Sequence, residues 1–477
     1  MLFNSIEFAL FLPIVFFFYW FVFNKNIKQQ NALLLLASYI FYGWWSWKYL
    51  ILIFISTMVD FFSGIMLQKE HNRHKRKVYL FISIFFNLGM LMYFKYANFF
   101  IENFVTAFTF FGYKPDIKSL NIVLPVGISF YTFQTMSYTI DIYRKKMLPT
   151  KDFIAFATFV SFFPQLVAGP IERAIHLLPQ FFKPRKFDYS LAADGMRQIL
   201  WGVFKKVVIA DTCAKYVDIA FSSHESMSSI ALITGAVLFA FQIYGDFSGY
   251  SDVAIGTARL FGFDLMQNFA FPYFSRDIAE FWRRWHISLS TWFRDYVYIP
   301  LGGSRGTKWK QVRNTMAVFL ISGFWHGANW TFIAWGFLNA LYFLPLLLLN
   351  KNRHHLDVVA SGKILPSIKE TFMMFITFGL TVLAWIFFRA QSVAQAVDYI
   401  KHIFAVDMSG KGLHVPKFLL LALFVFISVE WLQRQQKHGF YLTEQIPVLI
   451  RWSSYIILAF ITAFFMGKAN SFIYFQF

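Results

Sequence analysis

Long apolar runs recur along nearly the whole chain and constrain its fold more than any other feature. They lie near residues 8–23, 31–47, 49–67, 78–94, 153–168, 199–221, 229–245, 315–349, 371–388, 416–432 and 447–466. Of the 477 residues, 57% are hydrophobic and only 14% are charged, which leaves too little polar surface for a soluble protein. The sequence therefore predicts an all-α integral membrane protein, a multi-pass bundle of roughly ten to twelve spanning and re-entrant helices. No repeat or low-complexity tract divides the chain, so we expect a single domain over residues 1–477.

The charge balance indicates how the chain lies in the membrane. Lys and Arg outnumber Asp and Glu by 44 to 25, giving a formal net charge of +19. Retention of basic loops on the cytoplasmic side explains most of this excess, and binding of a phosphate-bearing substrate or of anionic lipid is the alternative. Basic clusters at 25–28 and 69–77 are separated by an even number of crossings, so both are predicted to be cytoplasmic and both termini extracytoplasmic. Nucleic-acid binding is excluded because no soluble basic domain exists to provide it.

The stretch ISGFWHGANW, residues 321–330, places one imidazole inside apolar sequence. The surrounding block, 315–349, is flanked by basic residues and is too long for one crossing. From Asn314 to Trp325 a helix would rise about 18 Å, little more than half of the hydrocarbon core. We therefore expect the block to enter the bilayer, break near Gly327 and return, with His326 near mid-membrane.

An ionisable residue inside the membrane indicates a functional site by default. Histidine titrates near neutral pH, so His326 could take a proton from a hydroxyl or return one to a leaving group. Trp325 and Asn329 lie beside it in sequence, and the Asn329 amide is a candidate to orient the ring or to donate to an oxyanion. The alternative is a structural imidazole that is hydrogen-bonded between helices.

A second group of candidates lies in FWRRWHISLSTWFRDYVYIPLGGSR, residues 281–305. Aromatic residues recur there at helical spacing, which predicts an amphipathic helix at the cytoplasmic interface. The opposite face would carry polar residues, and the candidates are His286, Arg283, Arg284, Arg294 and Asp295. Arginine pairs well with phosphate, which acyl carriers such as coenzyme A contain, so these residues are predicted to bind the donor. For His286 a structural role is equally open.

Two further segments contain candidate residues, one at 242–263 and one at the C-terminus, 471–477. QIYGDFSGYSDVAIGTARLFGF, residues 242–263, holds Asp246 and Asp252, which are either helix caps or pocket walls. The chain ends SFIYFQF, and a tail with Phe472, Tyr474 and Phe477 but no charge after Lys468 suggests that it inserts back into the protein. No zinc-protease motif, phosphate-binding loop, dinucleotide fingerprint or nucleophile elbow occurs, so we expect no metal and no tightly bound cofactor.

The segments YGDFSGYSDVAIG, FWRRWHISLSTWFRDYVYIPLGG and FWHGANWTFIAWG resemble the membrane-bound O-acyltransferases. The similarity is to the branch that contains the membrane subunit of bacterial alginate O-acetylation and related cell-wall acetylation proteins. It runs essentially the whole length, including the opening MLFNSIEFALFLPIVFFFYW and the ending FIYFQF.

The resemblance implies a multi-helix fold around a transmembrane tunnel, which the acyl donor enters from the cytoplasm. It also implies that His326 and His286 are the two histidines of the family site. In related envelope-acylating systems a terminal F-x-Y-x-x-F motif is proposed to hold the acyl group on its tyrosine. That motif matches Phe472, Tyr474 and Phe477 here, which makes residues 471–477 a C-terminal acyl-relay tail.

The expected function is transfer of an acetyl group from a cytoplasmic donor, acetyl-CoA as cosubstrate, across the bacterial cytoplasmic (inner) membrane. The acceptor would be an extracytoplasmic glycan, an alginate-like polysaccharide or peptidoglycan, reached through a separate extracytoplasmic acetyltransferase. One alternative is transfer of D-alanyl or another acyl group from a carrier protein. A transporter or flippase is a minor alternative, since it predicts an inverted repeat that the sequence lacks.

Overall fold

The computed structural model describes residues 1–113, 115, 117–442, 446–467 and 472–473. These residues form helices and loops without a β-strand, which confirms the all-α prediction. Their contacts divide the chain into two compact units, residues 1–192 with 258–265 and residues 193–257 with 266–477. Whether the two units act as one domain, as the sequence led us to expect, stays a prediction.

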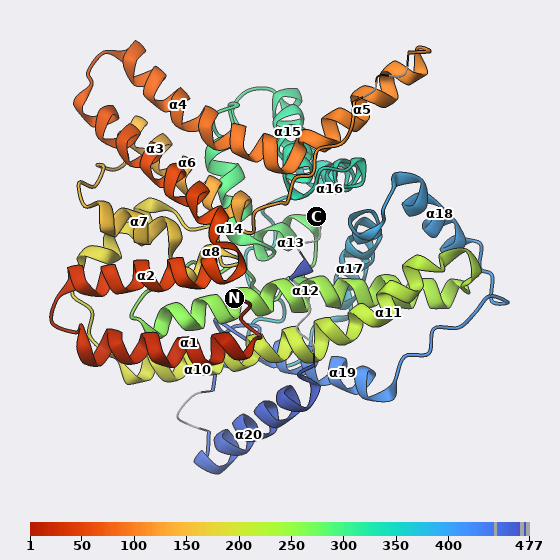
Figure 1. Ribbon diagram of the computed structural model, residues 1–477. Helices are drawn as coiled ribbons and strands as arrows, with labels where there is room; N and C mark the ends of the chain where they lie inside the picture. Colours follow the sequence, from red (N-terminus) through yellow and green to blue (C-terminus); the bar gives the residue numbers. More distant parts are fainter. Residues whose placement is uncertain (114, 116, 443–445, 468–471, 474–477) are drawn as a thin grey trace. The chain divides into compact units, whose positions relative to one another are not determined.

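The first unit is built from helices α1 to α9. They are α1 (Ile6–Phe17), α2 (Ile27–Ser46), α3 (Leu50–Lys69), α4 (Arg73–Leu91), α5 (Ala97–Phe110), α6 (Ile128–Tyr143), α7 (Phe153–Ser161), α8 (Phe163–Leu166) and α9 (Ala174–Leu177). Figure 1 shows α3 and α4 as neighbouring orange helices joined by a short turn. Helix α6 packs against both of them.

Helices α3 and α4 of the first unit bury polar side chains and expose several large apolar ones. On α4, Ser83 and Asn87 are fully buried, whereas Phe81 and Phe85 are 65% and 67% exposed. Helix α3 likewise buries Asp60 completely. This arrangement suits a helix whose outer face meets lipid, because polar groups there would have no hydrogen-bond partner.

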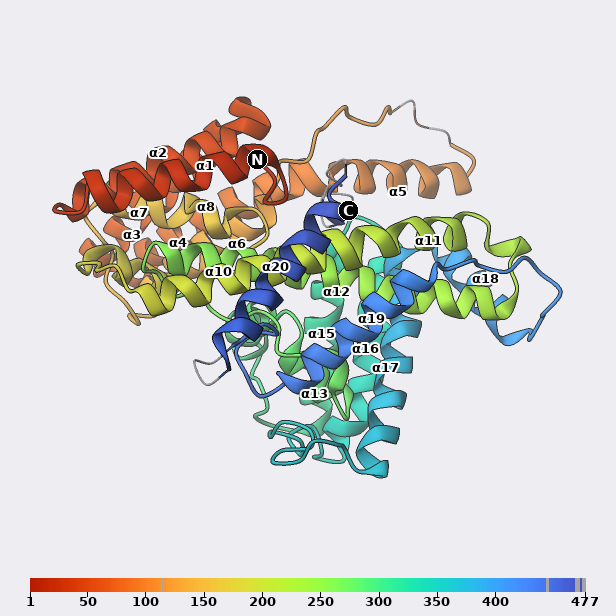
Figure 2. The ribbon, with the colours of Figure 1, turned by 90° about the horizontal axis from the view of Figure 1, so that it is seen from below.

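The second unit is built from helices α10 to α20. They are α10 (Tyr189–Phe204), α11 (Asp211–Ser222), α12 (Ser229–Leu260), α13 (Ile278–Arg284), α14 (Ile287–Phe293), α15 (Lys308–His326), α16 (Trp330–Leu348), α17 (Ile368–Arg389), α18 (Val393–Phe404), α19 (Lys417–Leu432) and α20 (Val448–Phe465). A π-helical turn, η5 (Lys205–Ala210), joins α10 to α11. Figure 2 shows α15, α16 and α17 running alongside one another, in agreement with the contacts of α16 to both neighbours.

Six helical stretches among the described residues are long and apolar enough to cross a bilayer, judged by length and composition. One predicted boundary differs from the structure. The run expected at 229–245 is part of one 32-residue helix that continues through the glycine-rich 242–263 segment to Leu260. The segment LPVGISF, residues 124–130, leads into the regular and almost entirely buried helix α6.

Candidate active site

Helices α15 and α16 form the hairpin that the sequence predicts. Helix α15 ends at His326, and α16 begins at Trp330 after the short segment 327–329. Gly323 and Gly336 lie where the two helices cross, and a Cβ atom on either one would approach the Cα of the other to 3.3 Å. Small residues at such a crossing let two helix backbones approach closely, which is a common packing in membrane proteins. The crossing therefore determines where the end of α15, with its histidine, lies.

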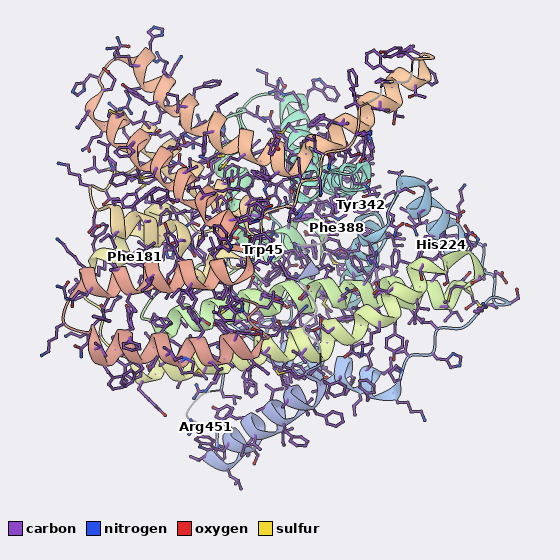
Figure 3. All side chains as sticks on the ribbon, in the orientation of Figure 1. Trp45, Phe181, His224, Tyr342, Phe388 and Arg451 are labelled. Carbon is purple, nitrogen blue, oxygen red and sulfur yellow. The ribbon has the colours of Figure 1, made fainter. Side chains whose placement is uncertain are left out.

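The side chain of His326 is buried in an aromatic enclosure. His326 is 3% exposed, and its ring centroid lies 5.0 Å from those of Trp325 and Trp335 and 5.3 Å from that of Phe388. Phe388 is labelled on α17 in Figure 3, so three helices contribute to the enclosure. Its rings exclude bulk water from the imidazole.

The prediction of one amphipathic helix over 281–305 is wrong. Helix α13 ends at Arg284, α14 begins at Ile287, and His286 between them has a left-handed backbone with φ of 43°. Such a conformation is costly for a residue other than glycine and is often found at functional sites. Arg283 and Arg294 therefore lie on different elements and do not share one helix face.

Asn268, which sequence reasoning missed, braces this break from the preceding loop. Its backbone carbonyl accepts the amide of Ile287 at 2.9 Å, and its Oδ1 accepts the hydroxyl of Ser288 at 2.9 Å. On the other side of the break, the Ala270 amide donates to the carbonyl of Arg284 at 2.9 Å. These bonds hold His286 in its left-handed conformation. No local pattern marks Asn268, because the bonds join residues about twenty positions apart.

The break brings the two predicted histidines together. The ring centroids of His286 and His326 lie 6.4 Å apart, and His286 is 1% exposed. Neither ring nitrogen of His286 has a hydrogen-bond partner among the described residues. Leaving a buried polar group unpaired costs about 1–3 kcal/mol. An unpaired imidazole next to a second imidazole is therefore a candidate for binding a reactant.

The arginines of the 281–305 segment do not form one cluster. Both Arg283 and Arg284 bind within the protein, the first to the carbonyls of Asn352 and His355 and the second to Glu280. They hold the loop after α16 and the end of α13. A donor-binding role for these two arginines stays a prediction.

Arg294 lies instead at a cavity of about 210 Å³ in the second unit. It is ion-paired to the adjacent Asp295 at 2.7 Å, and Arg353 from the loop after α16 lines the same cavity. The remaining wall is mostly apolar and includes Trp282, Leu289, Phe293, Val318, Phe319, Phe343 and Leu347. Two arginines on an apolar cavity suit a molecule with an anionic end and an uncharged end.

The cavity is connected to His326 through one intervening aromatic ring and along helix α15. Ser322, one turn before His326 on α15, lines the cavity wall. The ring of Trp282, also in the wall, lies 5.6 Å from that of Trp335, which contacts His326. Arg353, Trp282 and Trp335 were not singled out as site residues from the sequence, because no local pattern connects the cavity wall to His326.

Asn329 serves as the N-cap of α16. Its Oδ1 accepts the amide of Thr331 at 2.9 Å, and its Nδ2 donates to the carbonyl of Gln391 at 3.1 Å. The amide thereby ties the α15–α16 turn to the end of α17. The proposed donation to an oxyanion stays a prediction.

The two carboxylates of the 242–263 segment lie within α12 and are not helix caps. Asp252 pairs with Lys205 at 2.5 Å, and Asp246 pairs with Lys206 at 2.7 Å. Of the C-terminal motif, Phe472 is fully buried against α12, 4.6 Å from the ring of Tyr250. Tyr474 and Phe477 lie outside the described residues.

One group of side chains in the described part of the chain could hold a metal ion. Ligand atoms of His224, Glu225 and Asp398 lie within 4.8 Å of one another. They belong to α18 and to the turn after α11, and not to the helices that carry the histidine pair.

Comparison with known proteins identifies the family of the chain. The model of the MBOAT family, the membrane-bound O-acyltransferases, matches residues 148–387, a span that includes both histidines. This chain belongs to the MBOAT family. It is therefore a multi-pass membrane protein and an O-acyltransferase.

Among its relatives, "Probable alginate O-acetylase AlgI" of Pseudomonas aeruginosa is 40% identical over 398 residues, covering 83% of this chain and 73% of the relative. The peptidoglycan O-acetyltransferase of Helicobacter pylori is 36% identical over 447 residues, covering 87% of this MBOAT chain and 82% of the relative. A teichoic acid D-alanyltransferase of Streptococcus thermophilus is more distant, 28% identical over 306 residues, 58% of this chain and 71% of the relative.

Proposed function

We propose that this MBOAT protein transfers acetyl groups from a cytoplasmic donor, acetyl-CoA, across the membrane for O-acetylation of an extracytoplasmic glycan. The observation that carries the proposal is the pair of buried histidines beside an arginine-lined cavity. The names of the nearer relatives, which act on alginate or peptidoglycan, support a polysaccharide of the cell envelope as the acceptor.

The donor enters at the cavity in this proposal. Arg294 and Arg353 bind the phosphates of coenzyme A, while the apolar wall receives the pantetheine arm and directs the thioester toward His326. Substitution of Arg353 by the uncharged Gln should raise the KM for acetyl-CoA about three- to tenfold. The kcat should change little, because the arginine contacts the donor equally in the ground and transition states. Lys310→Gln, on the same basic side of α15 but away from the cavity lining, is the matched control.

His326 then acts as general base. It removes the proton from the accepting hydroxyl as the hydroxyl oxygen attacks the thioester carbonyl, and the departing thiolate takes up that proton. His286 is close enough to take part through a bound reactant, since the two rings are 6.4 Å apart. The aromatic enclosure keeps water from competing with the acceptor.

The immediate acceptor in this proposal is the hydroxyl of Tyr474, which would hold the acetyl group as an ester. A separate extracytoplasmic acetyltransferase then moves it to a glycan hydroxyl. Both termini lie on the extracytoplasmic side of the bacterial inner membrane, as the distribution of Lys and Arg indicates.

Donor identity separates this proposal from D-alanyl transfer, which the more distant relatives keep open. Membranes that contain the protein are incubated with radiolabelled acetyl-CoA, and label bound to the protein is measured. We expect label in the wild type and its loss in Tyr474→Phe. Label that appears only with an acyl-charged carrier protein would favour the alternative, and unchanged labelling of Tyr474→Phe would exclude that tyrosine as the acceptor.

A further inference from the structure

The second unit contains a buried charge network whose partners include the last described part of the chain. Lys206 lies 2.9 Å from Asp211 and 2.7 Å from Oδ1 of Asp246. The other oxygen of Asp246, Oδ2, accepts the backbone amide of Ile473 at 2.7 Å. The side chains of Lys206 and Asp246 are each 4% exposed, so both charges are removed from water.

The glycines of the 242–263 segment make this network possible. A Cβ at Gly249 would lie 2.7 Å from the carbonyl oxygen of Gly202, and one at Gly245 would lie 3.0 Å from that of Lys205. Because both positions lack a side chain, the end of α10 and the π-helical turn η5 can lie directly against α12. That close approach carries Lys206 to Asp246.

Stability alone does not explain why a protein keeps a buried ion pair such as Lys206–Asp246. Removing two charges from water costs more than their attraction usually returns, and an apolar pair of similar volume is often as stable. Ionisable residues inside membrane proteins accordingly tend to serve a function. Here the Asp246 carboxylate accepts a hydrogen bond from the backbone amide of Ile473, and an apolar side chain in its place could not accept one.

The neighbouring residue strengthens the same attachment. Phe472 is fully buried, and its ring lies 4.6 Å from that of Tyr250 and 5.6 Å from that of Phe247. The ring of Phe247 in turn lies 4.6 Å from that of His286. One phenylalanine of α12 therefore contacts both the docked tail and one histidine of the site.

We propose that Asp246, held by Lys206, is a positioning residue that anchors the C-terminal tail so that Tyr474 can reach the histidine pair. Tyr474 follows Ile473 directly, and consecutive Cα atoms are about 3.8 Å apart, so an anchored Ile473 amide restricts where the tyrosine hydroxyl can go. The role in transfer rests on the proposed function, since it requires Tyr474 as acceptor. The anchoring itself does not.

The first test measures anchoring without any acyl donor. Hydrogen exchange of the C-terminal peptide is followed by mass spectrometry on the full-length protein in lipid nanodiscs. Asp246→Ala should speed exchange of the Ile473 amide roughly 10- to 100-fold, because a hydrogen bond to a charged acceptor is lost. Asp252→Ala, which removes the other carboxylate of α12 and its bond to Lys205, should leave this exchange unchanged. Equal exchange in Asp246→Ala and the wild type would overturn the anchor.

A second pair of variants acts on the tail and leaves the charge network intact. Ile473→Pro removes the donated N–H, whereas Ile473→Ala keeps it and trims only the side chain. Acetyl transfer should fall at least tenfold in the Pro variant relative to the Ala variant, with equal thermal unfolding midpoints. An equal loss of acetyl transfer in both variants would mean that Ile473 contributes only through packing of its side chain, and it would overturn the positioning role.

Tyr474→Phe separates the two proposals. If that variant retains transfer while Asp246→Ala still frees the tail, the anchor stands and the tyrosine acceptor of the proposed function fails. If Tyr474→Phe loses transfer and Asp246→Ala leaves the tail protected, the relay stands and the anchor fails.

Discussion

Each unit of this MBOAT protein buries polar side chains that differ in how completely they are paired. The comparison is between the Asp60 network of the first unit and the His286 imidazole of the second. In the first unit, the two oxygens of Asp60 accept from Ser83 at 2.5 Å and Asn87 at 2.8 Å. The Asn87 Oδ1 accepts in turn from Ser56 and Thr135. In the second unit, the ring nitrogens of His286 have no partner among the described residues.

The difference separates structural from chemical use of buried polar groups. A network in which every group is paired can hold helices together, because no desolvated donor or acceptor is left over. An unpaired buried group lowers stability unless a reactant later supplies the missing bond. The first cluster therefore fits a packing role for α3, α4 and α6, and the second fits a reaction site.

The largest effect is expected for His326→Ala, which removes the imidazole of the reaction site. We expect acetyl transfer to fall by roughly 10²–10⁴, the usual contribution of a general base, with the thermal unfolding midpoint nearly unchanged. Transfer is measured with labelled donor in membranes of matched protein content. His438→Gln, a buried histidine paired with Asp194 at 3.0 Å, is the control and should keep transfer. Wild-type acetylation by His326→Ala would remove this residue from the site.

His286→Asn tests the incomplete cluster directly. Asparagine tolerates the left-handed backbone at this position, so the variant should fold. We expect transfer to drop by roughly 10², the lower end for an acid–base group, while the unfolding midpoint stays equal or rises. A clear fall in the midpoint together with retained specific activity would mean that His286 is structural after all.

Asp60→Ala should give the opposite pattern. Ser83 and Asn87 would lose their shared acceptor, and we expect the free energy of unfolding to fall by about 2–4 kcal/mol. Specific activity of the protein that remains folded should change little. Asp60→Asn, which keeps one acceptor oxygen, is the matched milder change. Loss of transfer in Asp60→Asn at normal stability would show that the paired cluster also has a chemical role.

The smallest expected effect concerns a paired histidine outside the membrane-spanning helices. Hydrogen bonds to Asp264 and then to Glu172 raise the pKa of His176 to about 10. Because the folded pKa lies above the unfolded value, the stabilisation is complete below about pH 6.5 and is lost as the pH rises toward 10. Unfolding midpoints measured across this window should fall more for the wild type than for His176→Gln. Parallel pH profiles would contradict the pairing.

Local sequence patterns correctly predicted the elements whose structure depends on neighbouring residues. Apolar runs, basic flanks and Gly327 predicted the α15–α16 hairpin and the position of His326 at its turn. The same approach failed at 281–305, where aromatic spacing suggested one helix and the chain instead breaks at His286. The bonds that impose the break come from Asn268, which no local pattern connects to it.

Composition and motifs were enough to predict that this protein is helical and membrane-embedded, to identify its family and to name the two histidines as site candidates. These properties follow from composition and from residue types at close spacing. Helix packing, in contrast, sets the 6.4 Å distance between the two histidine rings, the cavity that Arg294 and Arg353 share, and the bond from the Ile473 amide to Asp246. Such pairings join residues distant in the chain, and they form only where helix packing, permitted by glycines such as Gly249 and Gly323, brings two backbones close enough.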